Sequence, residues 1–315
     1  MGQFQYASYP NGILYRGYHN ISRGLPAQYT CGHYTLLAGA KIMKWYKEDF
    51  KGRGRISVKQ SIANYVPLNS SSAADLAAVQ RTYEFNLGWQ AGSWTDDGDY
   101  PVSMRDTLGD ILPSLSEENK TLIRNSQDFM AIDPYQTYFA SAPEGGIEAC
   151  ASNSSHPNWP GCIITGPIDS DGFPSGPASA STSASWLWSN PSGIRQLLSK
   201  ITKDLYPSIP DIVISEFGFV EPGEGERTSL SEILWDLRRA DYFQGYLDNI
   251  LAARVIDGVN VTGAFAWAIY DNIEWFSGKI TRFGLQHVNY SDPMLTRTPK
   301  ASMFQFTDWF KEHMP

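Results

Sequence analysis

Apolar residues recur along the chain at two spacings, and each spacing predicts a type of secondary structure. Spacings of three and four residues, which place side chains on one face of an α-helix, occur in five segments. Short apolar runs bounded by turn residues, which are typical of β-strands, occur in four others. We therefore expect helices over 29–50, 70–89, 193–205, 228–255 and 298–313, and strands within 52–62, 126–139, 211–217 and 261–270.

The predicted strands alternate with helices, and this order is typical of parallel βαβ units. We therefore predict an α/β fold. Three of the strands end in acidic residues, namely Asp133, Glu216, and Asp271 with Glu274. Because ligands gather at the carboxyl ends of parallel strands, these residues predict one site at that edge. The Gly-, Ser- and Pro-rich stretch 140–192 lacks either spacing, and we expect a long functional loop there.

The composition narrows the class of function. Hydrophobic residues make up 42% and charged residues 18% of the 315 residues, as in a globular protein with a full core. The net charge is −8 and no basic stripe is present, so we expect no nucleic-acid partner. No apolar run reaches the roughly 18 residues that span a bilayer, so we expect no membrane contact. The ten Trp and seventeen Tyr suit a site that stacks on sugars.

Cysteines and the N-terminal residues bear on the compartment. The start, "MGQFQYASYPNG", has neither the basic nor the apolar region of a secretory signal, so we expect a cytoplasmic protein. Cys150 and Cys162 bracket a short loop, and Cys31 would be left over. Without a signal, free thiols are favoured over a bridge. Six N-x-S/T sequons weakly indicate the opposite, at Asn20, Asn69, Asn119, Asn153, Asn260 and Asn289.

The segment "IVISEFGFVEPGEG", residues 212–225, places a carboxylate at the end of a predicted strand, just before turn residues. Barrel enzymes commonly present a catalytic acid in this way. Taken alone, Glu216 is either a nucleophile or a residue where a buried strand meets water. A second carboxylate that works with it would decide between the two.

Four segments together resemble glycoside hydrolase family 1, the β-glucosidase-like retaining enzymes. "DNIEWFSGKITRFGLQHVNY" resembles the D-N-F-E-W…R-F-G-L signature of the family, and "IVISEFG" stands where the family has I-x-V-T-E-N-G. "FMAIDPYQTY" resembles F-x-G-x-N-x-Y-x-x-x-Y, and "DYPVSMRDTLGDILPSLSEENKTLI" resembles a Y-P-x-x-M…L-G-x-R-L-P stretch. The matches keep the order of the family over residues 24–312, which is nearly the whole chain.

The resemblance implies roles for individual residues. Glu216 aligns with the catalytic nucleophile, and Tyr135 aligns with the tyrosine that donates a hydrogen bond to it. A small-molecule glycoside is therefore the expected ligand, and no cofactor or metal is implied. The expected substrate-binding residues are Trp267, Glu274, Trp275, Phe283 and Asp133, the last of which stands where the family has Asn.

The chain also departs from the family. The general acid/base of the family lies in a T-F-N-E-P segment, and nothing upstream of the matching "GLPAQYTCGHYTLLAGA" reads N-E-P. Phe217 follows Glu216 where the family has Asn. Retaining glycosidases use two carboxylates about 5–5.5 Å apart. Because no N-E-P segment is found, the sequence does not identify the carboxylate that would work with Glu216. Candidates for it are Asp133, Glu274, Asp96, Asp97 and Asp99.

For the fold, the resemblance implies roughly the second half of a (β/α)8 TIM barrel, with residues 1–315 as one truncated domain. Its last four strands with their helices would leave open sheet edges. A second copy of the chain could cover these edges, or the strands and long loops could rearrange. The sequence could also be an incomplete gene product.

Three functions fit these residues. The first is a β-glucosidase-like retaining hydrolase, expected to be weak because general acid–base help is worth about 10²–10⁴-fold. The second is an inactive pseudoenzyme or sugar-binding module that keeps the aromatic residues. The third is an enzyme repurposed for another small-molecule reaction, which Phe217 and Asp133 would fit.

Overall fold

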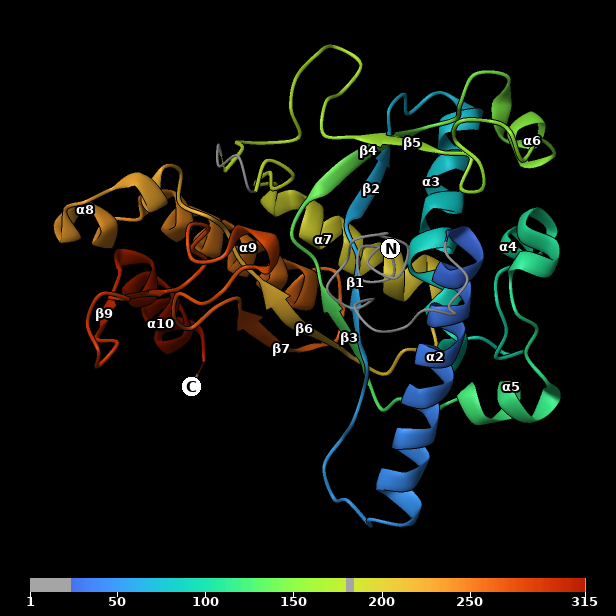
Figure 1. Ribbon diagram of the computed structural model, residues 1–315, viewed down its shortest axis with the longest axis horizontal. Helices are drawn as coiled ribbons and strands as arrows, with labels where there is room; N and C mark the ends of the chain where they lie inside the picture. The colour runs from blue at the N-terminus through green and yellow to red at the C-terminus, as the bar shows by residue number, and fades with distance from the viewer. Residues whose placement is uncertain (1–23, 180–183, 315) are drawn as a thin grey trace. The chain divides into compact units, whose positions relative to one another are not determined.

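The computed structural model (Figure 1) describes residues 24–179 and 184–314, and its elements follow the expected alternation of strands and helices. The chain divides into two compact units whose segments interleave. The first unit holds the described residues up to Ala131, then 140–166 and 206–210. The second unit holds 132–139, 167–205 and the described residues from Asp211 onward. The N-terminal stretch considered as a signal and the Asn20 sequon lie outside the described residues.

The first unit contains short strands and most of the N-terminal helices. Strands β3 (Met130–Asp133) and β4 (Thr137–Ser141) each run from one unit into the other. Strand β3 is hydrogen-bonded to β1, and β4 lies between β2 and β5. The remaining elements of this unit are α2 (Leu25–Glu48), β1 (Lys59–Ser61), β2 (Asn64–Pro67), α3 (Ala73–Asn86), α4 (Val102–Leu108), α5 (Glu117–Ile123), α6 (Gly146–Ala151) and β5 (Ile164–Gly166).

The core of the first unit forms where α2 and α3 bury aromatic side chains. Tyr29 of α2, Phe85 of α3 and Trp89 belong to one buried cluster. Gly32 of α2 lies against Trp89, whose ring would be 2.4 Å from a Cβ atom at position 32. Only glycine permits this approach, because the contact is shorter than any that two carbon atoms tolerate.

A disulfide joins Cys150 and Cys162 in the first unit, with a Cα–Cα distance of 5.6 Å. The expectation of free thiols at these positions is therefore wrong, while Cys31 is free as expected. The bridge closes the segment between α6 and β5, so its two ends are held together covalently. Such bridges persist mainly in oxidising compartments, and the expected cytoplasmic location stays a prediction.

The second unit is built on a sheet in which the end of β3 is followed by β6 and then β7. Strands β6 and β7 run parallel, with Ile212 opposite Val261 and Phe217 opposite Ala266. Helix α9 packs against both α7 and α10 (Figure 1). The α/β class with parallel strand pairing is thus confirmed. The elements are α7 (Pro191–Ser199), β6 (Ile212–Phe217), α8 (Leu230–Leu234), α9 (Leu237–Val255), β7 (Val261–Ala266), β8 (Gln286–Val288), β9 (Arg297–Pro299) and α10 (Ala301–His313).

Three expected elements differ from the structure. The strand expected within 126–139 is two strands, because the chain leaves β3 at Pro134, which has no backbone N–H to donate. The helix expected over 228–255 is interrupted between α8 and α9. The expected loop 140–192 contains α6, β5 and the start of α7 in its described part, so it is not structureless. None of the described helices is long and apolar enough to cross a membrane.

Candidate active site

Glu216 is the second-to-last residue of strand β6. Because successive side chains of a strand point to opposite faces of the sheet, Glu216 and its neighbour Phe217 lie on different faces. Glu216 is half-buried, whereas Phe217 is fully buried and its ring lies 5.3 Å from that of Phe243 on α9. The residue that replaces the Asn of the family signature therefore packs into the core behind the sheet. It contributes hydrophobic packing and no polar group to the site.

Tyr135 lies just beyond the end of β3 and donates a hydrogen bond from its hydroxyl to Glu216 Oε2 at 3.0 Å. Burial is the main reason why the pKa of Tyr135 lies well above its usual value, and the charges of Glu216 and Asp133 raise it further. The phenol therefore remains a neutral donor, and the Tyr135 bond orients one oxygen of the Glu216 carboxylate.

Trp267 follows β7 directly, and its backbone N–H donates to Phe217 O at 2.8 Å. This bond holds the ends of β6 and β7 together next to Glu216. Gly218 passes so close that a Cβ atom there would lie 2.0 Å from Trp267 O, so the position admits only glycine. The indole of Trp267 then donates from Nε1 to Glu274 Oε2 at 3.4 Å, a long hydrogen bond.

The half-buried carboxyl of Glu274 is the second acidic group at this end of the sheet. Burial raises its pKa above the usual range, the hydrogen bond from Trp267 opposes the rise, and the charge of Glu216 adds to it. An acid and an indole N–H side by side can accept from and donate to the hydroxyls of a sugar.

A buried ionic network anchors the loop that carries Glu274. Asp271 at the start of the loop accepts from Gly284 N at 3.0 Å and pairs with Lys300 Nζ at 2.8 Å. Lys300 also pairs with Glu224 at 2.5 Å, and Glu224 pairs with Arg239 of α9. All four side chains of this network are at most 2% exposed. The carboxylate of Asp271, at the end of the predicted strand, is therefore engaged in a structural hydrogen bond and ion pair.

The other expected site residues occupy different environments. Phe283 is buried, and its ring centroid lies 6.2 Å from that of Tyr135 in an edge-on arrangement. Trp275 is 67% exposed. Asp133 at the end of β3 is buried. All seven expected residues belong to the second unit, and their roles stay predictions.

Comparison with known proteins gives the family. The model of glycosyl hydrolase family 1 matches residues 1–314. This chain belongs to glycosyl hydrolase family 1. It is 33% identical over 313 residues to β-glucosidase 44 of Arabidopsis thaliana and 34% identical over 288 residues to raucaffricine-O-β-D-glucosidase of Rauvolfia serpentina. These alignments cover 96% and 91% of the chain but 57% and 51% of the two relatives.

Solved structures of the family agree with this assignment. A β-glucosidase of the fungus Humicola insolens in complex with glucose matches 96% of the chain with a TM-score of 0.84 and 31% identity. A rice β-glucosidase mutant in a covalent complex with Glc matches 96% with a TM-score of 0.80 and 29% identity. The chain covers 61% of each of these. This family 1 chain therefore spans little more than half the length of its relatives.

The acidic loop considered as a source of the second carboxylate lies in the first unit. Asp99 is buried and forms ion pairs with Arg105 and, at 3.0 Å, with Lys120. Asp97 accepts from the backbone N–H of Asp99 at 3.1 Å. Asp96 is exposed and lines an open pocket of about 390 Å³. Of the candidates, Asp133 and Glu274 are the ones that share a unit with Glu216.

One aromatic neighbour of Tyr135 was missed in the sequence. The indole of Trp186 is 40% exposed and lies edge-on to Tyr135, with ring centroids 5.7 Å apart. It stands inside the Gly/Ser-rich stretch 140–192, where periodicity gives no signal. The sequence offers no cue that separates Trp186 from Trp159 and Trp188 of the same stretch.

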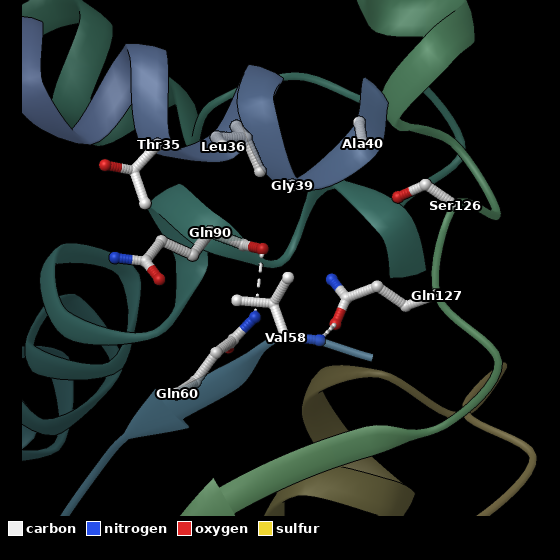
Figure 2. Close-up of a pocket in the computed structure, with 9 residues that line it drawn as sticks. All are labelled: Thr35, Leu36, Gly39, Ala40, Val58, Gln60, Gln90, Ser126 and Gln127. Atoms are coloured by element: carbon white, nitrogen blue, oxygen red, sulfur yellow. Dashed lines mark hydrogen bonds between the residues drawn. The ribbon is translucent and has the colours of Figure 1, made fainter. Parts of the chain in front are cut away.

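A small pocket in the first unit is not the glycoside site (Figure 2). Its volume is about 20 Å³, which suits one water molecule and no sugar. Its polar lining includes Gln60, which donates to Gln90 O at 3.1 Å, and Gln127, which accepts from Val58 N at 3.1 Å. Within residues 24–179 and 184–314, no three His, Cys, Asp or Glu side chains are grouped to hold a metal ion.

Proposed function

We propose that this chain carries the nucleophile side of a β-glucosidase-like retaining site, with Glu216 as the attacking carboxylate. The observation that carries the proposal is the hydrogen bond from Tyr135 to Glu216 Oε2 at 3.0 Å, at the end of β6 in a family 1 chain. This bond orients the carboxylate of Glu216 at the carboxyl end of the strand. Trp267 and Glu274 would hold the hydroxyls of the glycone, and Trp275 and Phe283 would wall the pocket.

In the first chemical step, a Glu216 oxygen bonds to the anomeric carbon while the bond from that carbon to the aglycone oxygen breaks. The electron pair leaves with the aglycone. A phenolate with a low pKa departs without a proton, whereas an alcohol needs a general acid. In the second step, water attacks the glycosyl ester, and a base must take its proton. We propose weak hydrolysis, because neither Asp133 nor Glu274 stands where the family has the general acid/base for these proton transfers.

The test is covalent labelling by a mechanism-based fluorinated β-glucoside with a good leaving group, read as a mass increase on the Glu216 peptide. Wild-type protein is expected to label, and Glu216→Gln is expected not to. Turnover of an aryl β-glucoside is the second measurement. Folded wild-type protein that neither labels nor turns over would refute the proposal.

A sugar-binding module without catalysis is the second candidate, and the 67% exposure of Trp275 favours it, because a solvent-exposed indole can stack on a sugar ring. In that case Trp267→Ala abolishes glycoside binding in calorimetry, while Glu216→Gln spares it. The hypothesis of an enzyme repurposed for another small-molecule reaction loses the support of Phe217, because this side chain is buried behind the sheet.

For the fold, we propose that the second unit corresponds to the last strands of a (β/α)8 barrel, with β7 as an open edge. The match to family 1 structures over 61% of their length supports this. Among the described residues, β7 has one strand neighbour, β6, and Phe265 on β7 is 60% exposed. We propose that a second copy of the chain covers this edge.

A further inference from the structure

Two buried tyrosines on α9 converge on one backbone atom next to the candidate nucleophile. Tyr246 donates from its hydroxyl to Tyr135 O at 2.8 Å, and Tyr242 donates to the same oxygen at 3.3 Å. The two residues are one helical turn apart, and their rings stack with centroids 3.9 Å apart. Each is 1% exposed. A backbone carbonyl has two lone pairs, and here both acceptor positions face a phenol of α9.

The surroundings leave these hydroxyls little freedom. Tyr246 also accepts from Asn190 N at 3.5 Å, at the start of α7. Phe217 stacks on Tyr246 with centroids 6.3 Å apart, and Phe219 stacks on Tyr242 at 5.2 Å. Because close-packed aromatic rings cannot turn without displacing their neighbours, the hydroxyls point in fixed directions. Tyr242 and Tyr246 are thus fixed by the same segment, 217–219, that follows Glu216.

We propose that Tyr242 and Tyr246 are positioning residues that fix the backbone of Tyr135 and, through it, the carboxylate of Glu216. The inference rests on the proposed function. Tyr135 follows Pro134 at the point where the chain leaves β3, so no strand pairing holds its carbonyl. With that carbonyl held by α9, the phenol of Tyr135 reaches Glu216 Oε2 at 3.0 Å. Small misplacements of a reacting group are costly to the rate, so this support matters for the attack step.

The test uses Tyr246→Phe, which removes one hydroxyl and keeps the ring. We expect the maximal rate of labelling by the fluorinated β-glucoside to fall about two- to thirteenfold, as the loss of one hydrogen bond implies. The half-saturating concentration stays unchanged, because the sugar contacts are intact. Adding Tyr242→Phe is expected to lower the rate further.

Tyr83→Phe is the matched control, since Tyr83 is equally buried, belongs to the first unit and bonds to Asn64 Oδ1 at 3.1 Å. It is expected to label like the wild type. A Tyr246→Phe protein that labels at the wild-type rate, or one in which only the half-saturating concentration changes, would overturn the inference.

A crystal structure of Tyr246→Phe gives a readout that needs no catalysis. We expect the distance from the Tyr135 hydroxyl to Glu216 Oε2 to lengthen beyond hydrogen-bonding range, while it stays at 3.0 Å in wild type. An unchanged distance refutes the inference. If the wild type fails to label, the proposed function fails, and the crystal structure still decides whether these tyrosines position Tyr135.

Discussion

Glu274 lies close enough to Glu216 for the charge of one carboxylate to affect the other. Burial raises the pKa of Glu274, the hydrogen bond from Trp267 opposes the rise, and the charge of Glu216 adds to it. Glu274 therefore binds a proton more tightly in the folded chain than in the unfolded chain. A carboxyl of this kind contributes stability that is fully present below its unfolded pKa and is lost as the pH rises through its raised folded pKa.

We predict that Glu274→Gln removes this pH dependence. The melting temperature of the variant relative to wild type is expected to rise as the pH increases from about 4 toward neutrality, because the wild type then carries a charge on the half-buried Glu274. Differential scanning calorimetry at several pH values measures it, with Glu226→Gln, an exposed acid of the same unit, as control. A Glu274→Gln difference that is constant with pH would contradict the prediction.

At the same scale, the sequence identified residues that the structure brings together. Glu216 and Tyr135 share a hydrogen bond, and so do Trp267 and Glu274. Trp186 escaped notice, because its position is set by a loop and loops carry no periodic signal. The two α9 tyrosines also escaped notice, since a buried aromatic at helical spacing reads as core. Only the fold shows that their hydroxyls meet Tyr135.

At the scale of elements, the break between α8 and α9 shows what a helical pattern omits. The apolar spacing over 228–255 is continuous, so one helix is the natural prediction. In the structure, Asp236 is fully buried, pairs with Arg239 at 2.5 Å and accepts from Ser302 N at 2.9 Å. Ser302 lies 66 positions away, on α10. A pattern read within a short window contains no information about such a partner.

We predict that Arg239→Met is strongly destabilising. Arg239 is fully buried and pairs with both Asp236 and Glu224, so its loss leaves buried Asp236 without its cation and Glu224 with Lys300 alone. Removing one side of a buried ion pair costs about 3–5 kcal/mol of unfolding free energy, which urea titration measures. Arg238→Met at the exposed neighbouring position is expected to change it by no more than about 0.5 kcal/mol. Similar values for the two variants would show that the network does not stabilise the unit.

The shortest strands could not be predicted from the sequence. Strands β5 and β9 have three residues each, and β2 has four, which is too short for alternation to be recognised. The longer β6 and β7 were found, although β7 ends at Ala266, before the predicted end at 270. Its apolar run continues past the last pairing with β6, and only pairing separates the strand from the loop.

At the scale of the whole molecule, the chain spans about half the length of the curated relatives it matches. The sequence established the family and the parallel α/β class, because these depend on motif order and on alternating elements. It did not establish what lies beside β7 on the side away from β6. That depends on chain or partner segments that no local pattern of this sequence describes.

We predict that the chain self-associates through β7. Phe265→Glu is expected to lower the association constant at least tenfold, because it places a charge on an exposed apolar edge strand. Sedimentation velocity over a range of concentrations measures this. Phe173→Glu, at an aromatic that is 67% exposed outside β7, is the control. A wild-type chain that stays monomeric, or an unchanged association constant for Phe265→Glu, would rule out the proposed dimer edge.

The Cys150–Cys162 bridge determines how a laboratory should prepare this protein. Expression in a reducing bacterial cytosol yields the dithiol, whereas a eukaryotic secretory host yields the bridge and also has the machinery that adds sugars to asparagine. The two hosts therefore produce chemically different molecules from one gene. Intact-mass spectrometry should therefore determine the disulfide and glycosylation state of each preparation first. Without it, a lack of activity in one preparation says nothing about the other. Four sequon asparagines are exposed, namely Asn69, Asn153, Asn260 and Asn289.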